Sequence, residues 1–156
     1  MAMKKIIKIV FVLVLVILLA GCKGKESVLK CSFKTDQSAS GYKIKYNYDI
    51  YYSDDVVNKT ITTETVTSKN NTILAYFEKQ LKNQYKINNE SFGGYTYEIT
   101  NKNGKVVSNV TIDYSKMDIK KFVKENPAMQ SYVNKSNQIT LKGIKKMYES
   151  MGATCK

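Results

Sequence analysis

Residues 42–68, YKIKYNYDIYYSDDVVNKTITTETVTS, decide the fold of this chain. From Tyr42 to Tyr52, tyrosine and isoleucine alternate with lysine, asparagine and aspartate, which is the two-residue period of a strand with one buried face. Ser53-Asp54-Asp55 has the composition of a turn. Val56–Ser68 is rich in threonine and valine, which favour strands. The stretch therefore predicts a long antiparallel hairpin.

Three further segments flank this hairpin. Upstream, Val28–Phe33 predicts a first strand, and Thr35–Gly41 predicts a polar loop. Downstream, apolar residues recur at helical spacing in Ile73–Tyr85, after a candidate N-cap within the loop 70–72. Gly93-Gly94 then predicts a break in the chain.

The last third of the chain predicts a second hairpin and two helices. The alternating residues of 95–99 and 106–114 are joined through Asn103-Gly104, a type I′ turn signal. Ser115 and Asp118 have the spacing of a capping box before a short helix, Asp118–Asn126, that Pro127 ends. Thr140 is the candidate cap of a final helix that ends at Gly152.

This order of elements predicts one α+β domain. No strand–helix–strand unit repeats, so we expect an antiparallel β-sheet built from hairpins with two or three packed helices. The apolar positions of the best-patterned elements predict a shared core of Tyr46, Ile50, Phe77, Leu81, Val110, Ile112, Ile144 and Tyr148.

The N-terminus has the features of a bacterial lipoprotein signal. Three lysines within residues 1–8 precede the unbroken apolar run of residues 9–20. That run would form a signal-peptide helix of about 18 Å, which is too short to cross a bilayer core. The string Leu-Leu-Ala-Gly-Cys at residues 18–22 resembles a lipobox, in which the cysteine thiol receives a diacylglyceryl group and anchors the protein stably.

These features divide the chain into three parts. Residues 1–21 are expected to be a cleaved signal peptide, residues 22–27 a tether lipidated at Cys22, and residues 28–156 a single extracytoplasmic domain. The expected location is the outer face of the cell membrane of a bacterium, most simply a Gram-positive one.

Two cysteines remain once Cys22 is acylated. Cys31 and Cys155 make an even number in an exported domain, so we expect them to form a disulfide that ties the first strand to the end of the last helix. The alternative is a pair of unbonded buried thiols, because many Gram-positive exported proteins avoid disulfides.

The chain is strongly basic, and all 25 of its basic residues are lysines. The net charge of +12 falls by three, to +9, when the signal is removed. This excess favours an anionic partner, namely lipid headgroups or a wall polymer, alongside the bilayer that receives acylated Cys22. Nucleic acid is not expected, because its readout depends on arginine, which is absent. The alternative is that the lysines only keep the protein soluble.

The sequence offers little for catalysis. It contains no histidine, so a catalytic dyad or triad with a histidine base is excluded. It also contains no phosphate-binding glycine loop and no metal-binding motif. We therefore expect no catalytic residues, no cofactor and no metal. A histidine-free enzyme using carboxylates such as Asp54-Asp55 is the weakest alternative, because neighbouring acids in a turn usually face solvent.

The twelve tyrosines are the one unusual feature of the composition. The tyrosine stripe of residues 42–52 could form a platform for a sugar or peptide, or it could lie in the core under the helices. An open cleft lined by several tyrosines would favour a binding domain. Full burial would favour an accessory or structural envelope protein without a small ligand.

Two segments carry a family resemblance. Asp113–Lys121 leads from a strand into a short helix, and Ile139–Gly152 opens and completes the last helix. With the lipobox and early hairpin, residues 18–152 resemble the YehR-like family of bacterial lipoproteins. The resemblance implies a small α+β lipoprotein of uncharacterised function and supplies no catalytic residues. Cys31 and Cys155 are not part of the family pattern.

Overall fold

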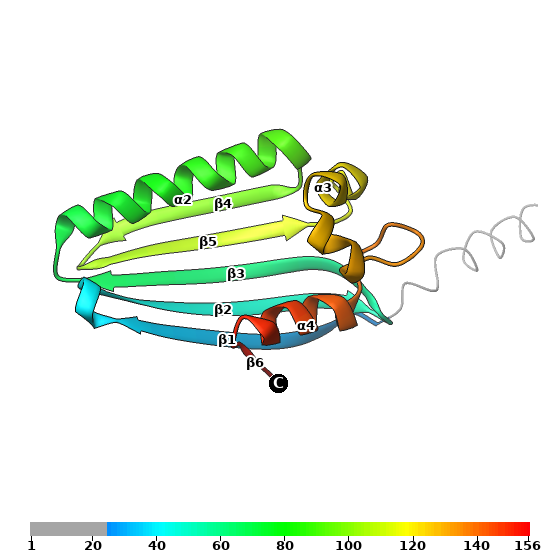
Figure 1. Ribbon diagram of the computed structural model, residues 1–156, viewed down its shortest axis with the longest axis horizontal. Coiled ribbons are helices and arrows are strands. Elements are labelled where there is room, and N and C mark those ends of the chain that lie inside the picture. Colours follow the sequence, from blue (N-terminus) through cyan, green and yellow to red (C-terminus); the bar gives the residue numbers. More distant parts are fainter. Residues whose placement is uncertain (1–24) are drawn as a thin grey trace, which may run out of the picture.

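The computed structural model of the protein describes residues 25–156 (Figure 1). The expected signal peptide and its helix, and the lipidation site Cys22, lie outside the described residues. All strands, helices and core clusters reported below lie within residues 25–156. No helix in this part of the chain is long and apolar enough to cross a membrane.

The described residues form one six-stranded sheet in the order β4-β5-β3-β2-β1-β6. Every neighbouring pair is antiparallel. The strands are β1 Ser27–Gln37, β2 Tyr42–Ser53, β3 Val56–Ser68, β4 Tyr95–Lys102, β5 Lys105–Asp113 and β6 Thr154–Cys155.

The helices lie against one face of this sheet (Figure 1). A long α-helix packs near β4 and β5, and a short one crosses β1 and β2 at the other side. The α-helices are α2 Asn71–Phe92, α3 Ile119–Glu125 and α4 Leu141–Ser150, and two short 3₁₀ helices are η1 Ser38–Ser40 and η2 Pro127–Tyr132. The expected α+β fold with an antiparallel sheet is therefore confirmed.

The predicted hairpin forms as β2 and β3, with Tyr46 opposite Glu64 and Tyr48 opposite Thr62. Because side chains alternate across a strand, these four residues share the helix-covered face. The second predicted hairpin also forms. Asn103 and Gly104 have φ angles of 54° and 72°, the two left-handed positions that a type I′ turn requires.

Two element boundaries differ from the sequence prediction. β1 continues to Gln37, because residues expected as a loop pair with β2 as far as Gln37–Tyr42. The helix expected over Ile73–Tyr85 extends to Phe92, whose ring packs edge-on against Phe122 of α3, with ring centroids 5.2 Å apart. In both cases tertiary contacts extend an element beyond its local pattern.

The core is divided into two clusters, so the expectation of one shared core is wrong. The first, which includes Ile50, Ile144 and Tyr148, lies between the sheet and α3 and α4. The second, which includes Leu81, lies under α2. Three residues expected in the core, Tyr46, Phe77 and Ile112, are only partly buried. The division arises because α2 and α4 cover opposite halves of the sheet.

The predicted disulfide between Cys31 and Cys155 is present, with a Cα–Cα distance of 4.0 Å. The two cysteines face each other across β1 and β6. The neighbouring pair, Lys30 and Lys156, exchanges both backbone hydrogen bonds, so the cysteines occupy a non-hydrogen-bonded position. That position brings facing Cα atoms closest together and explains the short separation.

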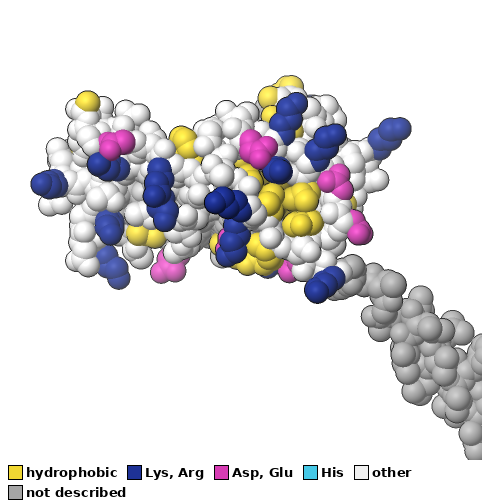
Figure 2. Space-filling model, turned by 90° about the horizontal axis from the view of Figure 1, so that it is seen from below, with side chains coloured by type: hydrophobic (Ala, Val, Ile, Leu, Met, Phe, Trp, Pro, Cys, Tyr) yellow, Lys and Arg dark blue, Asp and Glu magenta, His cyan; other side chains and the backbone are white. Residues whose placement is uncertain are grey.

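The lysines do not form a dense patch on the face shown in Figure 2. They are spread across it, and carboxylates lie among them. Within residues 25–156 several lysines form ion pairs, as Lys43 does with Asp36 at 2.7 Å, although both side chains are well exposed. Such exposed pairs contribute little to stability.

Candidate functional site

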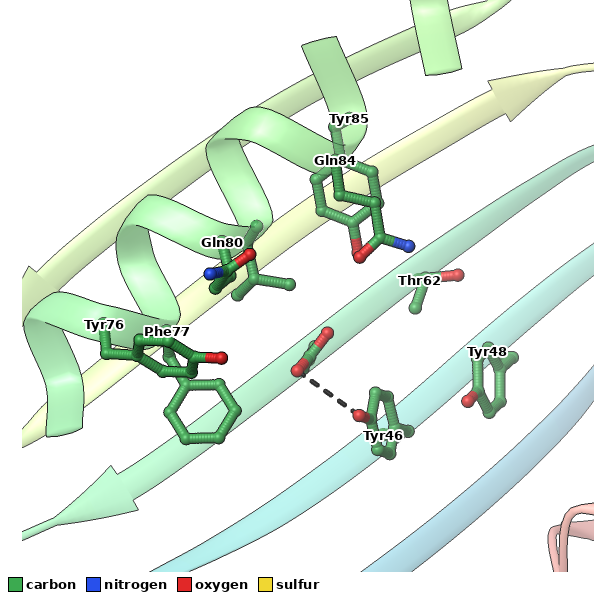
Figure 3. A pocket seen from close by; sticks show the side chains of 10 residues that line it. Tyr46, Tyr48, Thr62, Tyr76, Phe77, Gln80, Gln84 and Tyr85 are labelled. Carbon is green, nitrogen blue, oxygen red and sulfur yellow. Dashed lines mark hydrogen bonds between the residues drawn. The ribbon is translucent and has the colours of Figure 1, made fainter. Parts of the chain in front are cut away.

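A cleft of about 480 Å³ opens between α2 and the middle of the sheet (Figure 3). Its floor comes from β2 and β3, and its wall comes from α2. It lies over the region between the two core clusters. Its lining residues are Tyr46, Tyr48, Thr62, Glu64, Tyr76, Phe77, Gln80, Leu81, Gln84 and Tyr85.

Glu64 is the one acidic residue in the cleft lining, and it lies in the floor. Its side chain faces the helices because it lies on the same face of β3 as Thr62 and Val66, and it is only 6% exposed. The Tyr46 hydroxyl donates a hydrogen bond of 3.3 Å to Glu64 Oε1. Burial raises the pKa of the Glu64 carboxyl, and the hydrogen bond from Tyr46 opposes that rise.

No cation within residues 25–156 forms an ion pair with Glu64. Its neighbour across β5 is Ser108, whose hydroxyl is buried and has no partner of normal hydrogen-bond geometry in the described part of the chain. The cleft floor therefore holds a carboxylate with unused hydrogen-bonding capacity.

Three tyrosines near Glu64 are held in their protonated form. Burial, followed by the charge of Glu64, raises the pKa of Tyr46 and raises that of Tyr48 to about 12. Burial also raises the pKa of Tyr85, which the Ser108 hydroxyl partly offsets. Each phenol is therefore neutral at physiological pH, and the Tyr46 hydroxyl hydrogen is already donated to Glu64.

The α2 wall presents two rows of side chains. Tyr76, Gln80 and Gln84 form one row at four-residue spacing, and Phe77, Leu81 and Tyr85 form the next. The second row belongs to the stripe that predicted the helix, whereas the first lies at its polar border. Tyr76 is 59% exposed and stands at the rim.

The tyrosine stripe of β2 is therefore divided between the core and the lining of the cleft. Tyr48 is buried in the first core cluster and stacks on Tyr148, with ring centroids 4.1 Å apart. Tyr46 is partly exposed to the cleft and stacks on Tyr48 at 6.0 Å. The stripe predicted aromatic residues on this face, but it did not predict which of them line a cleft.

Sequence reasoning missed Glu64 altogether. The available signal was its position, because β3 alternates and Glu64 is the one charged residue among Thr60, Thr62, Glu64 and Val66. In the acidic pair that the sequence did single out, Asp55 has a structural role. The Asp55 backbone and side chain accept hydrogen bonds from the N–H groups of Leu141 and Lys142, at the start of α4.

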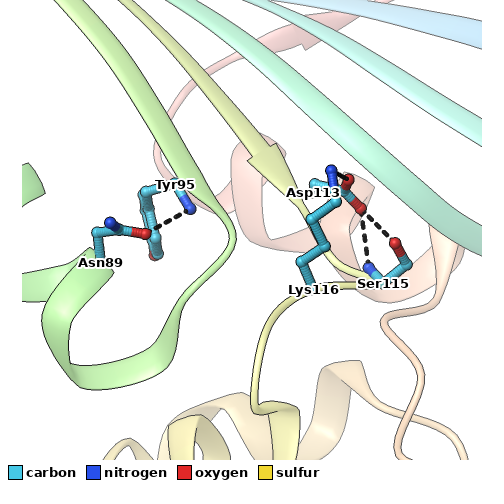
Figure 4. Close-up of polar contacts among 5 residues, drawn as sticks. All are labelled: Asn89, Tyr95, Asp113, Ser115 and Lys116. Atoms are coloured by element: carbon cyan, nitrogen blue, oxygen red, sulfur yellow. Dashed lines mark hydrogen bonds and ion pairs between the residues drawn. The ribbon is translucent and has the colours of Figure 1, made fainter.

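A second polar cluster, at the end of β5, is also structural (Figure 4). Asp113 accepts hydrogen bonds from the Ser115 backbone and hydroxyl, at 3.1 and 2.6 Å, and pairs with Lys116 at 2.8 Å. The predicted capping box is therefore wrong, because Ser115 holds the preceding turn. Asp118 itself caps α3 by accepting from the Lys121 N–H. No group of three or more metal-binding side chains occurs in residues 25–156.

The comparison with known proteins agrees with the family resemblance seen in the sequence. The family described as protein of unknown function (DUF1307) matches residues 31–154. A search among curated proteins finds no match.

Two solved structures share this fold. The NMR structure of the YehR protein of E. coli is 19% identical, with a TM-score of 0.55 over 86% of this chain and 93% of that chain. The NMR structure of a protein from Streptococcus pneumoniae TIGR4 is 14% identical, with a TM-score of 0.53 over 87% of this chain and 88% of that chain. At such identities the likeness concerns the fold alone.

Proposed function

This chain belongs to the family described as protein of unknown function (DUF1307), and from that premise we propose that it is a membrane-anchored, non-catalytic binding domain of the bacterial cell envelope. The single observation that carries the proposal is the open cleft over the sheet, with partly exposed tyrosines around a buried carboxylate. A largely aromatic lining with a few convergent polar groups is typical of ligand sites.

The anchor rests on the sequence. The charged N-terminus, the apolar run and the string ending at Cys22 support cleavage before Cys22 and its acylation. A tether of residues 22–27 reaches at most about 20 Å. Tyr46 lies six positions along β2 from Tyr52, which pairs with the first residue of β1, or roughly 20 Å from the tethered end. The cleft would then stand within about 40 Å of the membrane surface.

A binding role is better supported than catalysis. Hydrolysis of a glycosidic bond by two carboxylates needs a second acid across the substrate, and the cleft lining contains Glu64 as its sole acid. The lining also lacks cysteine and lysine, so it offers no thiol or amine nucleophile.

The second candidate is an accessory envelope protein without a small ligand. The burial of Tyr48 and Tyr148 in the core favours it, because those rings stabilise the fold rather than face a ligand. The dispersed lysines would then provide the main interaction, an attraction to anionic lipid headgroups or wall polymer.

A titration followed by NMR distinguishes the two candidates. The domain of residues 25–156 contains every element of the fold and is titrated with soluble wall oligosaccharides, short peptides and organic cations, while the tyrosine ring signals are recorded. The proposed function expects one class to shift the signals of cleft residues such as Tyr46 and Tyr85. Shifts confined to surface lysines would favour the accessory protein.

A matched pair of variants ties binding to the cleft. Gln84→Trp would fill the cleft from α2, whereas Asn83→Trp places the same ring on the opposite flank of the helix. Binding should be lost in the first variant and kept in the second. Equal binding by both variants would overturn the assignment of the cleft as the site.

A further inference from the structure

The cleft differs in charge from the rest of the molecule. The chain has 25 lysines against 13 acidic residues, yet no lysine lines the cleft and its one acidic residue is Glu64. A site for a phosphate, sulfate or carboxylate ligand would be expected to present lysines. The lining therefore disfavours an anionic ligand, in contrast to the outer surface.

Glu64 lacks the partner that a buried carboxylate requires. It is 6% exposed, it accepts one long hydrogen bond from Tyr46, and it forms no ion pair in the part of the chain that the structure describes. Removing a carboxylate from water is costly unless a cation or several donors compensate it. Glu64 lines the cleft, so a ligand there can bring the missing positive charge to this carboxylate.

The surrounding rings determine which kind of cation fits. Tyr46, Tyr48, Tyr76, Phe77 and Tyr85 all line the cleft, and the faces of aromatic rings attract ammonium groups. A calcium or magnesium ion needs several oxygen ligands, including more than one strong donor, whereas this cleft supplies one carboxylate. An ammonium group with apolar substituents can pair with that carboxylate and contact the rings at the same time.

We infer that the cleft binds the ammonium group of an organic cation, with Glu64 as its counter-charge and the tyrosine rings as its walls. This inference rests on the proposed binding function and specifies its ligand class. Gln80 and Gln84, at the cleft rim, would contact the polar remainder of the ligand.

The test compares probes that differ only in charge. Choline is titrated against its neutral isostere, in which a tert-butyl group replaces the trimethylammonium group, and the tyrosine ring signals are followed by NMR. We expect choline to bind at least roughly tenfold more tightly. Butylammonium, run in parallel, distinguishes a primary amine from a quaternary ammonium ligand.

Two variants that remove the same charge locate the effect. Glu64→Gln should abolish the preference for choline over the neutral isostere. Glu98→Gln should keep that preference, because Glu98 is exposed on β4 and lies on the face of the sheet away from the cleft. Glutamine has the shape of glutamate, and the fold of each variant is checked by the dispersion of its amide signals.

Each result has a distinct meaning. Equal affinity for choline and its neutral isostere, or an unchanged preference in Glu64→Gln, overturns the inference and leaves the binding function standing. The inference is also overturned, and the binding function stands, if a wall oligosaccharide or a peptide shifts the signals of the cleft tyrosines and no ammonium compound does. If no compound in either titration shifts them, the proposed function fails as well.

Discussion

Tyr48 of β2 stacks on Tyr148 of α4, with their ring centroids 4.1 Å apart and their planes inclined by 24°. This contact packs α4 against β2. Tyr46, two residues earlier on the same strand, has no such cover from α4 and borders the cleft. One contact thus marks the boundary between the core part and the cleft part of the tyrosine stripe.

Truncation of Tyr148 should destabilise the protein strongly. Tyr148 is 6% exposed, so Tyr148→Ala should lower the free energy of unfolding by about 3–5 kcal/mol, through lost burial and a cavity under α4. Urea unfolding followed by circular dichroism measures the change. Met151→Ala, at a position that is 48% exposed, is the control and should cost less than about 0.5 kcal/mol. Similar losses in both variants would contradict this role for Tyr148.

Two positions on the inward face of α2 predict a ranking of substitutions. Leu74 is 2% exposed, and Leu74→Ala should cost about 2–5 kcal/mol. Phe77 is only partly buried and borders the cleft, so Phe77→Ala should cost less than the 3–5 kcal/mol typical of a fully buried phenylalanine. Leu74→Ala should therefore lower the free energy of unfolding more than Phe77→Ala does. Chemical denaturation of both variants tests this order, and a larger loss of stability in Phe77→Ala would refute it.

The disulfide should contribute substantially to stability. The bond joins residues separated by 124 positions, so the chain-entropy model gives about 5 kcal/mol as an upper value. Cys31→Ser with Cys155→Ser should unfold at lower urea concentration than the oxidised protein. In the unreduced, denatured domain, thiol titration should find neither cysteine free. Two reactive thiols would show that the bond does not form in solution.

Glu64→Gln should stabilise the protein at neutral pH. Burial raises the pKa of Glu64 above its ordinary value of 4.5, so the folded state favours the protonated form. The contribution of Glu64 to the stability of the wild type is therefore fully present at a pH below its ordinary pKa. The wild type loses this contribution as the pH rises through the raised pKa.

The measurement is the melting temperature of wild type and Glu64→Gln between about pH 4 and pH 8, on either side of the ordinary carboxyl range. The melting temperature of Glu64→Gln should exceed that of the wild type by a margin that grows toward neutral pH. Glu98→Gln, at an exposed position, should show no comparable growth. A variant that is less stable than wild type at pH 7 would mean that the Glu64 charge is compensated in solution.

Cys22→Ser should abolish membrane anchoring. In the proposed lipoprotein, the Cys22 thiol receives the diacylglyceryl group, and a hydroxyl cannot replace it. The variant should therefore lose palmitate labelling and leave the detergent-soluble membrane fraction. Cys31→Ser should keep the label, because that cysteine bonds to Cys155. Continued labelling of the Cys22 variant would disprove the lipoprotein assignment.

The sequence by itself determined the elements whose signals are local. The alternation of residues 42–68 predicted both strands of the first hairpin, Asn103-Gly104 predicted the second turn, and Thr140 predicted the cap of α4. The number of cysteines, combined with the expected export of the domain, predicted the disulfide. Such signals depend on backbone preferences and periodicity over a few residues, so they can be recognised without knowledge of distant contacts.

Only the tertiary structure decided the ends of β1 and α2, the division of the core and the cleft. Gln37 is extended because it pairs with Tyr42, and α2 continues to Phe92 beside Phe122. In the sequence, Glu64 is one polar residue in a threonine-rich strand. Its burial follows from the packing of β2, β5 and α2 around it. Burial and charge compensation depend on which elements pack around a residue, and residues far apart in the chain make that packing.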